Sequence, residues 1–286
     1  MLGSDVPRRW WRALRPPRVL EVQDSASVRV DGDDHTVDLR HAPRVCVVAH
    51  WDAEGRVSHS VCVLLRALQS AGFSALLVSS APGGAPLTWV GGRPGGLTVL
   101  RRPNIGYDFG SWATALDRIP ALRRCENLLL MNDSLAGPFA SPAHLLSLFL
   151  TTDAAVWGLT DSLELAPHIQ SYCVGFKRGV LEQPELRRFW DGIRVEADKE
   201  RVVRRYEIGL SGVIRRMGIE AEAAIAAADV VEGTDNPTLH GWRRLLERGF
   251  PFVKRRVIRE TARWSPDEPV DDVLRRRFDV ELSAWL

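Results

Sequence analysis

The chain has 286 residues, of which 45% are hydrophobic and 26% charged, a balance typical of a globular protein with a sizeable core. Its 38 basic and 36 acidic residues leave a formal net charge of +2, which excludes a protein that binds polyanions through overall charge. Basic residues cluster near both ends, but no zinc-finger, RRM or KH signature accompanies them, so we interpret them as solvated faces and expect no nucleic-acid partner. These residues are Arg8, Arg9, Arg12, Arg15 and Arg18, and Lys254, Arg255, Arg256 and Arg259.

Cysteine usage and hydropathy indicate a cytoplasmic protein. The four cysteines are scattered and form no C-x-x-C pair, a pattern typical of a reducing compartment. We find no secretory signal and no apolar run of the ~18–20 residues that a membrane span needs. The segment "RRWWRALRPPR" at 8–18 is basic and carries two tryptophans, so it is either a peripheral contact with the inner face of the membrane or a short helix packed on the body.

Strand and helix patterns alternate from residue 44 onward. Apolar runs predict buried strands, and a helix with its apolar residues on one face lies between the first two of them. This β-α-β order favours a doubly wound α/β fold with a mostly parallel sheet and helices on both faces. The predicted strands are 44–50, 73–80, 97–102, 127–134, 154–162 and 171–181, and the predicted helices are 59–72, 141–151, 184–193 and 206–218, with a turn, a helix and a basic segment in 235–258.

Polar side chains stand where three of these strands end. They are His50 and Asp52 after the first strand, Asn132, Asp133 and Ser134 after "LLLM", and Asp161 in "LTDS". In an open α/β sheet, ligands bind outside the carboxyl ends of the strands, so these groups are expected to converge if their strands are parallel neighbours. Alternatively, Asp133 and Ser134 simply cap the next turn.

The loop "NIGYDFG" precedes a helix and contributes Asn104, Gly106 and Asp108 to the same predicted site. Glycines there allow backbone amides to approach a nucleotide diphosphate or its sugar, although a tight strand-to-helix turn would use the same residues. A divalent cation, Mg²⁺ or Mn²⁺, needs one or two carboxylates and completes its shell with phosphate oxygens and waters. Asp133 fits that requirement, and no histidine motif competes with it.

Two further segments carry candidate side chains. "HIQSY" combines His168, Gln170 and Ser171 in a pattern that suits sugar hydroxyls or an ordinary polar loop. Glu207 is predicted to open a helix, where a carboxylate is held ionised and is able to act as a general base. Asp161 is the second catalytic candidate, and Trp157 is a candidate sugar or acceptor contact.

Six blocks, taken together and in order, resemble the rhamnan synthesis protein F family of glycosyltransferases in bacterial polysaccharide assembly. They are "RRPNIGYDFGSW", "LLLMNDSLAGPF", "WGLTDS", "HIQSYCVGF", "YEIGLS" and "NPTLHGW…GFPFVKR". The resemblance covers nearly everything from about residue 45 to residue 258. The resemblance implies a GT-A-like nucleotide-sugar transferase core over 44–232. An extension over 1–43, with a basic helix and a hairpin, would precede it, and a helical, basic segment over 233–286 would follow.

The resemblance also implies roles for individual residues. The donor would be similar to dTDP-rhamnose, and the acceptor would be a glycan, a lipid-linked molecule or a small molecule. "MNDS" stands where GT-A enzymes carry a D-x-D-like motif, which makes Asp133 the residue for metal or diphosphate, while Asn104 and Asp108 become donor contacts. Glu207 falls where inverting enzymes keep an acidic base. A single carboxylate in "MNDS" departs from the D-x-D pattern and leaves metal dependence open.

Two other functions remain as alternatives at this point. A catalytically inactive sugar- or nucleotide-binding partner of a glycan-assembly complex would retain the fold without the turnover. An NAD-dependent oxidoreductase is disfavoured, because "VVAHWDAEGRVS" lacks the G-x-G-x-x-G turn after the first strand.

Overall fold

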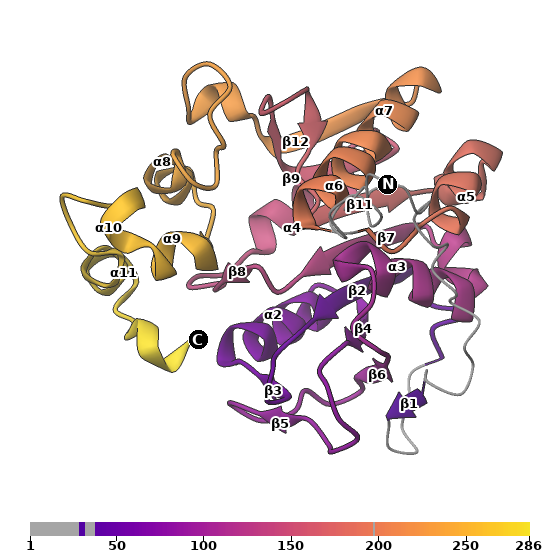
Figure 1. Ribbon diagram of the computed structural model, residues 1–286, viewed down its shortest axis with the longest axis horizontal. Helices are drawn as coiled ribbons and strands as arrows, with labels where there is room; N and C mark the ends of the chain where they lie inside the picture. Colours follow the sequence, from indigo (N-terminus) through magenta and orange to yellow (C-terminus); the bar gives the residue numbers. More distant parts are fainter. Residues whose placement is uncertain (1–28, 32–37, 197) are drawn as a thin grey trace, which may run out of the picture.

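The computed structural model describes residues 29–31, 38–196 and 198–286 (Figure 1). The predicted basic helix at 8–18 and most of the predicted hairpin at 27–39, including Gly32 of its turn, lie outside the described residues. Within them, no helix combines the length and the apolar character needed to cross a bilayer.

A large sheet of nine strands organises the described residues, in the order β1-β6-β4-β2-β7-β11-β9-β10 with β12 also paired to β9. The strands are β1 (Arg29–Asp31), β2 (Arg44–His50), β4 (Ser74–Ser79), β6 (Thr98–Arg101), β7 (Asn127–Asn132), β9 (Val156–Ser162), β10 (His168–Ile169), β11 (Cys173–Lys177) and β12 (Ala221–Ile225). The strands β6, β4, β2, β7, β9 and β12 run in one direction, while β1, β10 and β11 run against them. The predicted α/β class is therefore confirmed.

Helices cover both faces of this sheet. They are α2 (His59–Ser70), α3 (Tyr107–Arg118), α4 (Ala143–Thr151), α5 (Pro184–Asp191), α6 (Lys199–Val202) and α7 (Ile208–Arg216). Side chains alternate along β2, with Val48 packed into a core shared with α2 and α4, and Val47 packed into a core shared with α3, α5 and α7. Burial on both faces explains why β2 is a continuous apolar run in the sequence.

The C-terminal segment forms a third apolar cluster beside the sheet. It contains α8 (Trp242–Glu247), α9 (Arg255–Arg259), α10 (Thr261–Trp264) and α11 (Val270–Phe278), which lie together to the left in Figure 1. The short strand β13 (Val253–Lys254) pairs with β8 (Leu135–Ala136), just beyond the end of β7. Ala136 and Phe139 join the same cluster, so this segment packs directly on the chain that leaves β7. A separate two-stranded pairing joins β3 (Arg56–Val57) and β5 (Thr88–Trp89).

The direction of β11 corrects one assumption made from the sequence. β11 lies between β7 and β9 and is antiparallel to both, so the ends of β7 and β9 are not immediate neighbours. By contrast β2 and β7 are adjacent and parallel, with Ala49 opposite Asn132. The carboxyl ends that meet directly are therefore those of β2 and β7.

Candidate functional site

Asp133 lies at the junction of β2 and β7, where the sequence predicts a ligand. Its Oδ2 accepts a 2.9 Å hydrogen bond from the backbone N–H of Trp51, which follows β2. Burial raises the pKa of Asp133 to about 6, although the Trp51 hydrogen bond and the positive charge of Arg255 act in the opposite direction. A carboxylate is thus fixed at the sheet edge and partly deprived of water.

Asp108 brings a second carboxylate to the same place. It lies in the first turn of α3, and its Oδ2 accepts a 2.7 Å hydrogen bond from Nδ2 of Asn132. Burial raises the pKa of Asp108 to about 7, and the negative charge of Asp133 is the second largest cause of this shift. The Asn132 hydrogen bond acts in the opposite direction. A buried carboxylate whose proton affinity is raised by a neighbouring carboxylate forms a site that a cation would stabilise.

The loop before α3 is shaped by close backbone packing. Gly106 has φ 79° and is followed by Tyr107 at φ 56°, a left-handed conformation that is uncommon for a bulky residue. A Cβ on Gly110 would lie 2.4 Å from the carbonyl oxygen of Ile105, so the first turn of α3 depends on this glycine. Asn104 is exposed in this loop. The strained turn holds Asp108 against Asn132.

Ser134, which follows Asp133 in the sequence, has a buried hydroxyl oxygen without a hydrogen-bond partner among the described residues. Its N–H donates to Oδ1 of Asn132 at 3.1 Å, but its Oγ is shielded from solvent and has no hydrogen-bond partner among the described residues. Such atoms are uncommon in folded proteins and point to a missing water, ion or ligand.

Two cationic residues that the sequence interpretation assigned to a solvated face lie at this site instead. Arg255 donates from Nε to the carbonyl oxygen of Asp133 at 2.9 Å and from Nη2 to Ser58 Oγ at 2.7 Å, and its N–H bonds the carbonyl oxygen of Ser134. Lys254 precedes it and places Nζ 5.6 Å from the centre of the Tyr172 ring. Only Arg256 and Arg259 are exposed, as predicted.

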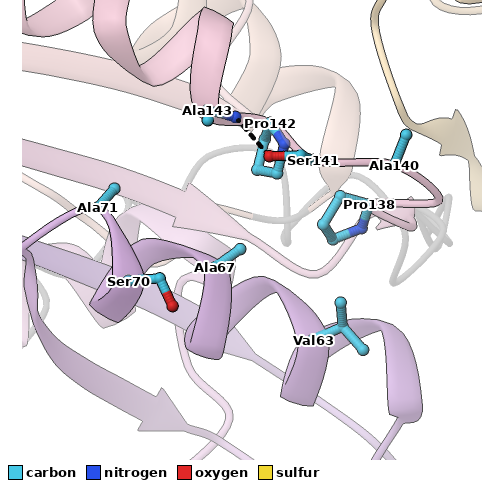
Figure 2. Close-up of a pocket in the computed structure, with 9 residues that line it drawn as sticks. All are labelled: Val63, Ala67, Ser70, Ala71, Pro138, Ala140, Ser141, Pro142 and Ala143. Carbon is cyan, nitrogen blue, oxygen red and sulfur yellow. Dashed lines mark hydrogen bonds between the residues drawn. The ribbon is translucent and has the colours of Figure 1, made fainter.

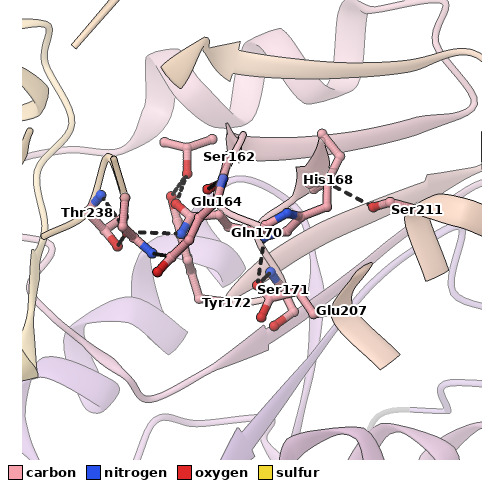
Figure 3. Close-up of polar contacts among 12 residues, drawn as sticks. Ser162, Glu164, His168, Gln170, Ser171, Tyr172, Glu207, Ser211 and Thr238 are labelled. Atoms are coloured by element: carbon pink, nitrogen blue, oxygen red, sulfur yellow. Dashed lines mark hydrogen bonds and ion pairs between the residues drawn. The ribbon is translucent and has the colours of Figure 1, made fainter. Parts of the chain in front are cut away.

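Glu207 lies within electrostatic range of the same site, because its negative charge contributes to the raised pKa of Asp108. Its Oε1 accepts a 2.7 Å hydrogen bond from the N–H of Ser171 and lies 3.9 Å from Nε2 of His168 (Figure 3). His168 is buried, and its Nδ1 lies 2.7 Å from the carbonyl oxygen of Ala166, which requires a proton on Nδ1. Both contacts of Glu207 are on Oε1, so Oε2 has no hydrogen-bond partner among the described residues.

The expected position of Glu207 at a helix start is wrong. A π-helical turn, Val203–Glu207, joins α6 directly to α7, so Glu207 lies inside one continuous helical segment. The positive end of a helix dipole therefore does not act on its carboxylate. π-helical turns are frequent at functional sites, and here the turn places Glu207 on the side that faces Ser171.

Several other candidates have structural partners instead of free polar atoms. His50 is buried with its two ring nitrogens 3.1 Å from Ser79 Oγ and from the carbonyl oxygen of Arg56, and burial lowers its pKa to about 4. Asp52 accepts from the N–H groups of Glu54 and Arg56 within its own turn.

The candidates on β9 are also tied to the fold. Asp161 accepts a 2.6 Å hydrogen bond from the N–H of Ala227 and is separated from β7 by β11, so the structure does not bring it to Asp133. Trp157 is 1% exposed and packs on Phe149, with ring centres 5.3 Å apart, which makes it a core residue out of reach of a sugar.

Gln170 is the centre of a buried polar network. Its Oε1 accepts from Thr160 Oγ1 at 2.6 Å, and its Nε2 donates to Asn236 Oδ1 at 3.2 Å, as Figure 3 shows in part. Thr160 Oγ1 also lies 2.7 Å from the Tyr172 hydroxyl. This network links the sheet to the C-terminal segment and leaves Ser171 as the partly exposed polar member of "HIQSY".

A hollow of about 320 Å³ lies elsewhere, between α2 and the loop before α4 (Figure 2). Its lining is formed by small and apolar residues: Val63, Ala67, Ser70, Ala71, Pro138, Ala140, Ser141, Pro142 and Ala143. It contains no ionisable side chain, so it does not offer the chemistry of the Asp108–Asp133 site.

The residues around Asp133 fit a divalent cation only if a ligand completes its shell. Among the described residues, no group of three or more histidine, cysteine and acidic side chains is arranged to hold a metal alone. Asp108, Asp133 and the unpartnered Ser134 Oγ nevertheless provide the one or two carboxylates and the extra oxygen that suit Mg²⁺ or Mn²⁺ beside a diphosphate.

Comparison with known proteins now identifies the family. The model of the family described as rhamnan synthesis protein F matches residues 97–282. The chain belongs to this family. The match starts later and ends later than the resemblance in the sequence, and it contains Asp108, Asp133, Glu207 and Lys254, whereas His50 and Asp52 precede it. The family description names rhamnan synthesis, which assigns this family to polysaccharide synthesis.

Two relatives show how far the likeness extends. Virulence protein VirA of Vibrio anguillarum is 26% identical over 209 residues, which cover 61% of this chain and 67% of that protein. Uncharacterized protein y4gN of Sinorhizobium fredii is 27% identical over 157 residues, covering 52% of this chain and 40% of that protein.

Proposed function

We propose that this chain is a glycosyltransferase that moves a sugar from a nucleotide diphosphate to a hydroxyl acceptor. The observation that supports it most is the convergence of Asp108, Asp133 and an unpartnered Ser134 Oγ at the ends of β2 and β7. A cation bound with a diphosphate would balance the two carboxylates, and such a ligand would supply the hydrogen-bond partner that Ser134 Oγ lacks. A GT-A-like transferase core is the corresponding fold proposal.

The proposed reaction uses Oε2 of Glu207 as the base. Oε2 would take the proton from the acceptor hydroxyl as its oxygen attacks the anomeric carbon, while the bond from that carbon to the diphosphate breaks and the nucleoside diphosphate leaves. Oε1 is held by the N–H of Ser171, so the carboxylate is oriented before the acceptor arrives. One base and no covalent nucleophile correspond to inversion at the anomeric carbon. A bound divalent cation would supply charge neutralisation for the leaving diphosphate.

The donor is proposed to be a dTDP-rhamnose-like nucleotide sugar, in keeping with the family description. The acceptor would be a glycan, a lipid-linked molecule or a small molecule. The test is incubation of the purified chain with a panel of nucleotide sugars and hydroxyl acceptors, with Mg²⁺, with Mn²⁺ or with EDTA. Released nucleoside diphosphate and a glycosylated product support the proposal.

A catalytically inactive binding partner remains the second candidate, because a site with oriented carboxylates binds a donor whether or not it turns over. Binding of a nucleotide sugar without release of diphosphate, in the presence of a full acceptor panel, would favour that candidate. Absence of both binding and release contradicts both candidates.

A further inference from the structure

The backbone of Lys254 adjoins the segment after β7, and its side chain reaches toward β11 and Glu207. Its backbone lies opposite Leu135 in the β13–β8 pairing, two residues beyond Asp133. Its side chain runs toward β11, where Nζ lies over the Tyr172 ring, and Glu207 exerts the largest electrostatic effect on it. The ammonium thus lies over a residue that borders the end of β7, because the carbonyl oxygen of Tyr172 accepts a hydrogen bond from the N–H of Asn132, and it lies within electrostatic range of the proposed base.

The ammonium of Lys254 has no hydrogen-bond acceptor or ion-pair partner within the part of the chain that the structure describes. Burial lowers the pKa of Lys254, and the charge of Glu207 opposes this effect. Two other partly shielded cations do have acceptors: Lys177 donates to the carbonyl oxygens of Leu150 and Thr152, and Arg255 donates to Asp133 and Ser58. Lys254 is partly buried, and its ammonium has three donors unused by the described residues, so it is available to an acceptor from outside the chain.

The segment that carries Lys254 is firmly held, which makes the position of the ammonium a property of the fold. Arg255 bonds three groups of the β7–β8 turn and α2, and Val253 is buried in the C-terminal cluster. The aromatic face of Tyr172 supports the lysine stem and favours the charged form of Nζ.

Resting on the proposed function, we propose that Lys254 binds the diphosphate of the donor and neutralises it as it leaves. When the bond between the anomeric carbon and the diphosphate oxygen breaks, the electron pair remains on that oxygen. The Lys254 ammonium, which donates hydrogen bonds and carries the opposite charge, stabilises it there. Part of the charge that a divalent cation would balance is then balanced by the chain itself.

The test compares Lys254→Met with Lys254→Arg and with Arg259→Met. Methionine retains the apolar stem over Tyr172 and removes the charge, arginine retains the charge, and Arg259 is an exposed cation of the same segment. Calorimetry with dTDP, UDP, GDP and CDP, and with each corresponding monophosphate, gives the affinities in EDTA and in Mg²⁺. Thermal melting of each variant establishes that it folds, and Lys254→Gln replaces the methionine variant if that one does not.

Loss of a charged hydrogen bond predicts that Lys254→Met binds the preferred diphosphate about 10- to 100-fold more weakly in EDTA. The affinity of Lys254→Met for the monophosphate should fall much less. Lys254→Arg should recover most of the affinity for the diphosphate, and Arg259→Met should bind it as tightly as the wild type does. If wild type binds a diphosphate and Lys254→Met binds it equally well, the role of Lys254 is wrong while the donor site stands. If wild type binds none of the nucleotides, the proposed function fails, and the role of Lys254 fails with it.

Discussion

Asn132 donates a 2.7 Å hydrogen bond from Nδ2 to Oδ2 of Asp108, which joins the end of β7 to the first turn of α3. This contact connects "MNDS" to "NIGYDFG", through two residues that lie 24 positions apart in the sequence. Asp133 follows Asn132 directly and adds its charge to that of Asp108. The site therefore has two carboxylates even though "MNDS" has one.

Because burial and the charge of Asp133 raise the pKa of Asp108, we expect the free energy of unfolding to fall as pH rises. The pKa of Asp108 is raised from 3.8 to about 7, so between these values the folded state binds more protons than the unfolded state. Stability from this group is fully present below pH 3.8 and is lost as pH rises toward 7. Asp108→Asn, which resembles the protonated form, should raise Tm at pH 8 by about 2–4 °C or more and leave it nearly unchanged at pH 4.

Melting curves of wild type, Asp108→Asn and Asp153→Asn at pH 4 and pH 8 check this expectation. Asp153 is exposed and serves as the matched control. Mg²⁺ or Mn²⁺ at pH 8 should restore part of the lost stability in wild type, because a cation relieves the repulsion, and should have less effect on Asp108→Asn. An equal response of all three proteins to pH would contradict the coupling of Asp108 to Asp133.

Removing the proposed base separates binding from turnover. Glu207→Gln keeps the acceptor for the Ser171 N–H and removes the group that takes a proton, so we expect transfer to fall by about 100-fold or more. The affinity for the donor should change little. Initial rates with a saturating donor, together with calorimetry, provide the measurement. Glu200→Gln, in the same helical segment and exposed, should retain full activity, and unchanged turnover in Glu207→Gln would exclude the base role.

We expect a Gly→Ala substitution to have opposite effects on the free energy of unfolding at two helical positions, Gly110 and Gly212. A Cβ on Gly110 would meet the Ile105 carbonyl oxygen at 2.4 Å, so Gly110→Ala should destabilise the fold by about 1–3 kcal/mol. In α7, a Cβ on Gly212 meets only the end of the Arg216 side chain at 3.4 Å, so Gly212→Ala should stabilise the fold by about 0.4–1 kcal/mol. Urea unfolding measures both values, and a neutral Gly110→Ala would show that the loop before α3 relaxes freely.

The features that sequence reasoning found are those encoded locally. The apolar runs of β2 and β7 are buried on both faces, which is why the two strands and their ends follow from the residue pattern. The hydrogen bond from Trp51 to Asp133 depends also on the pairing of these strands, which the pattern does not give. Asp108 and Asn132 were both candidates, although their direct contact was not predicted.

The features that it missed depend on pairings between distant segments. Lys254 and Arg255 reach the site because two residues of β13 pair with two of β8, and neither strand is long enough to leave a pattern. The direction of β11 depends on its connection to β9 and not on its own residues, so Asp161 was wrongly expected beside Asp133. Glu207 lies in a π-helical turn that has no simple sequence signature, so its helix was predicted to start too late.

We expect the two adjacent arginines Arg255 and Arg256 to differ in their contributions to stability and to donor binding. Arg255 donates to Asp133 and Ser58 and is partly buried, so Arg255→Met should cost about 2 kcal/mol or more in unfolding free energy and weaken donor binding, because the β7–β8 turn loses its support. Arg256 is exposed and pairs with Glu260 on the surface, so Arg256→Met should cost less than about 1 kcal/mol and leave binding intact. Urea unfolding and calorimetry on both variants measure the difference. Equal losses would indicate that Arg255 contributes only as one more surface charge.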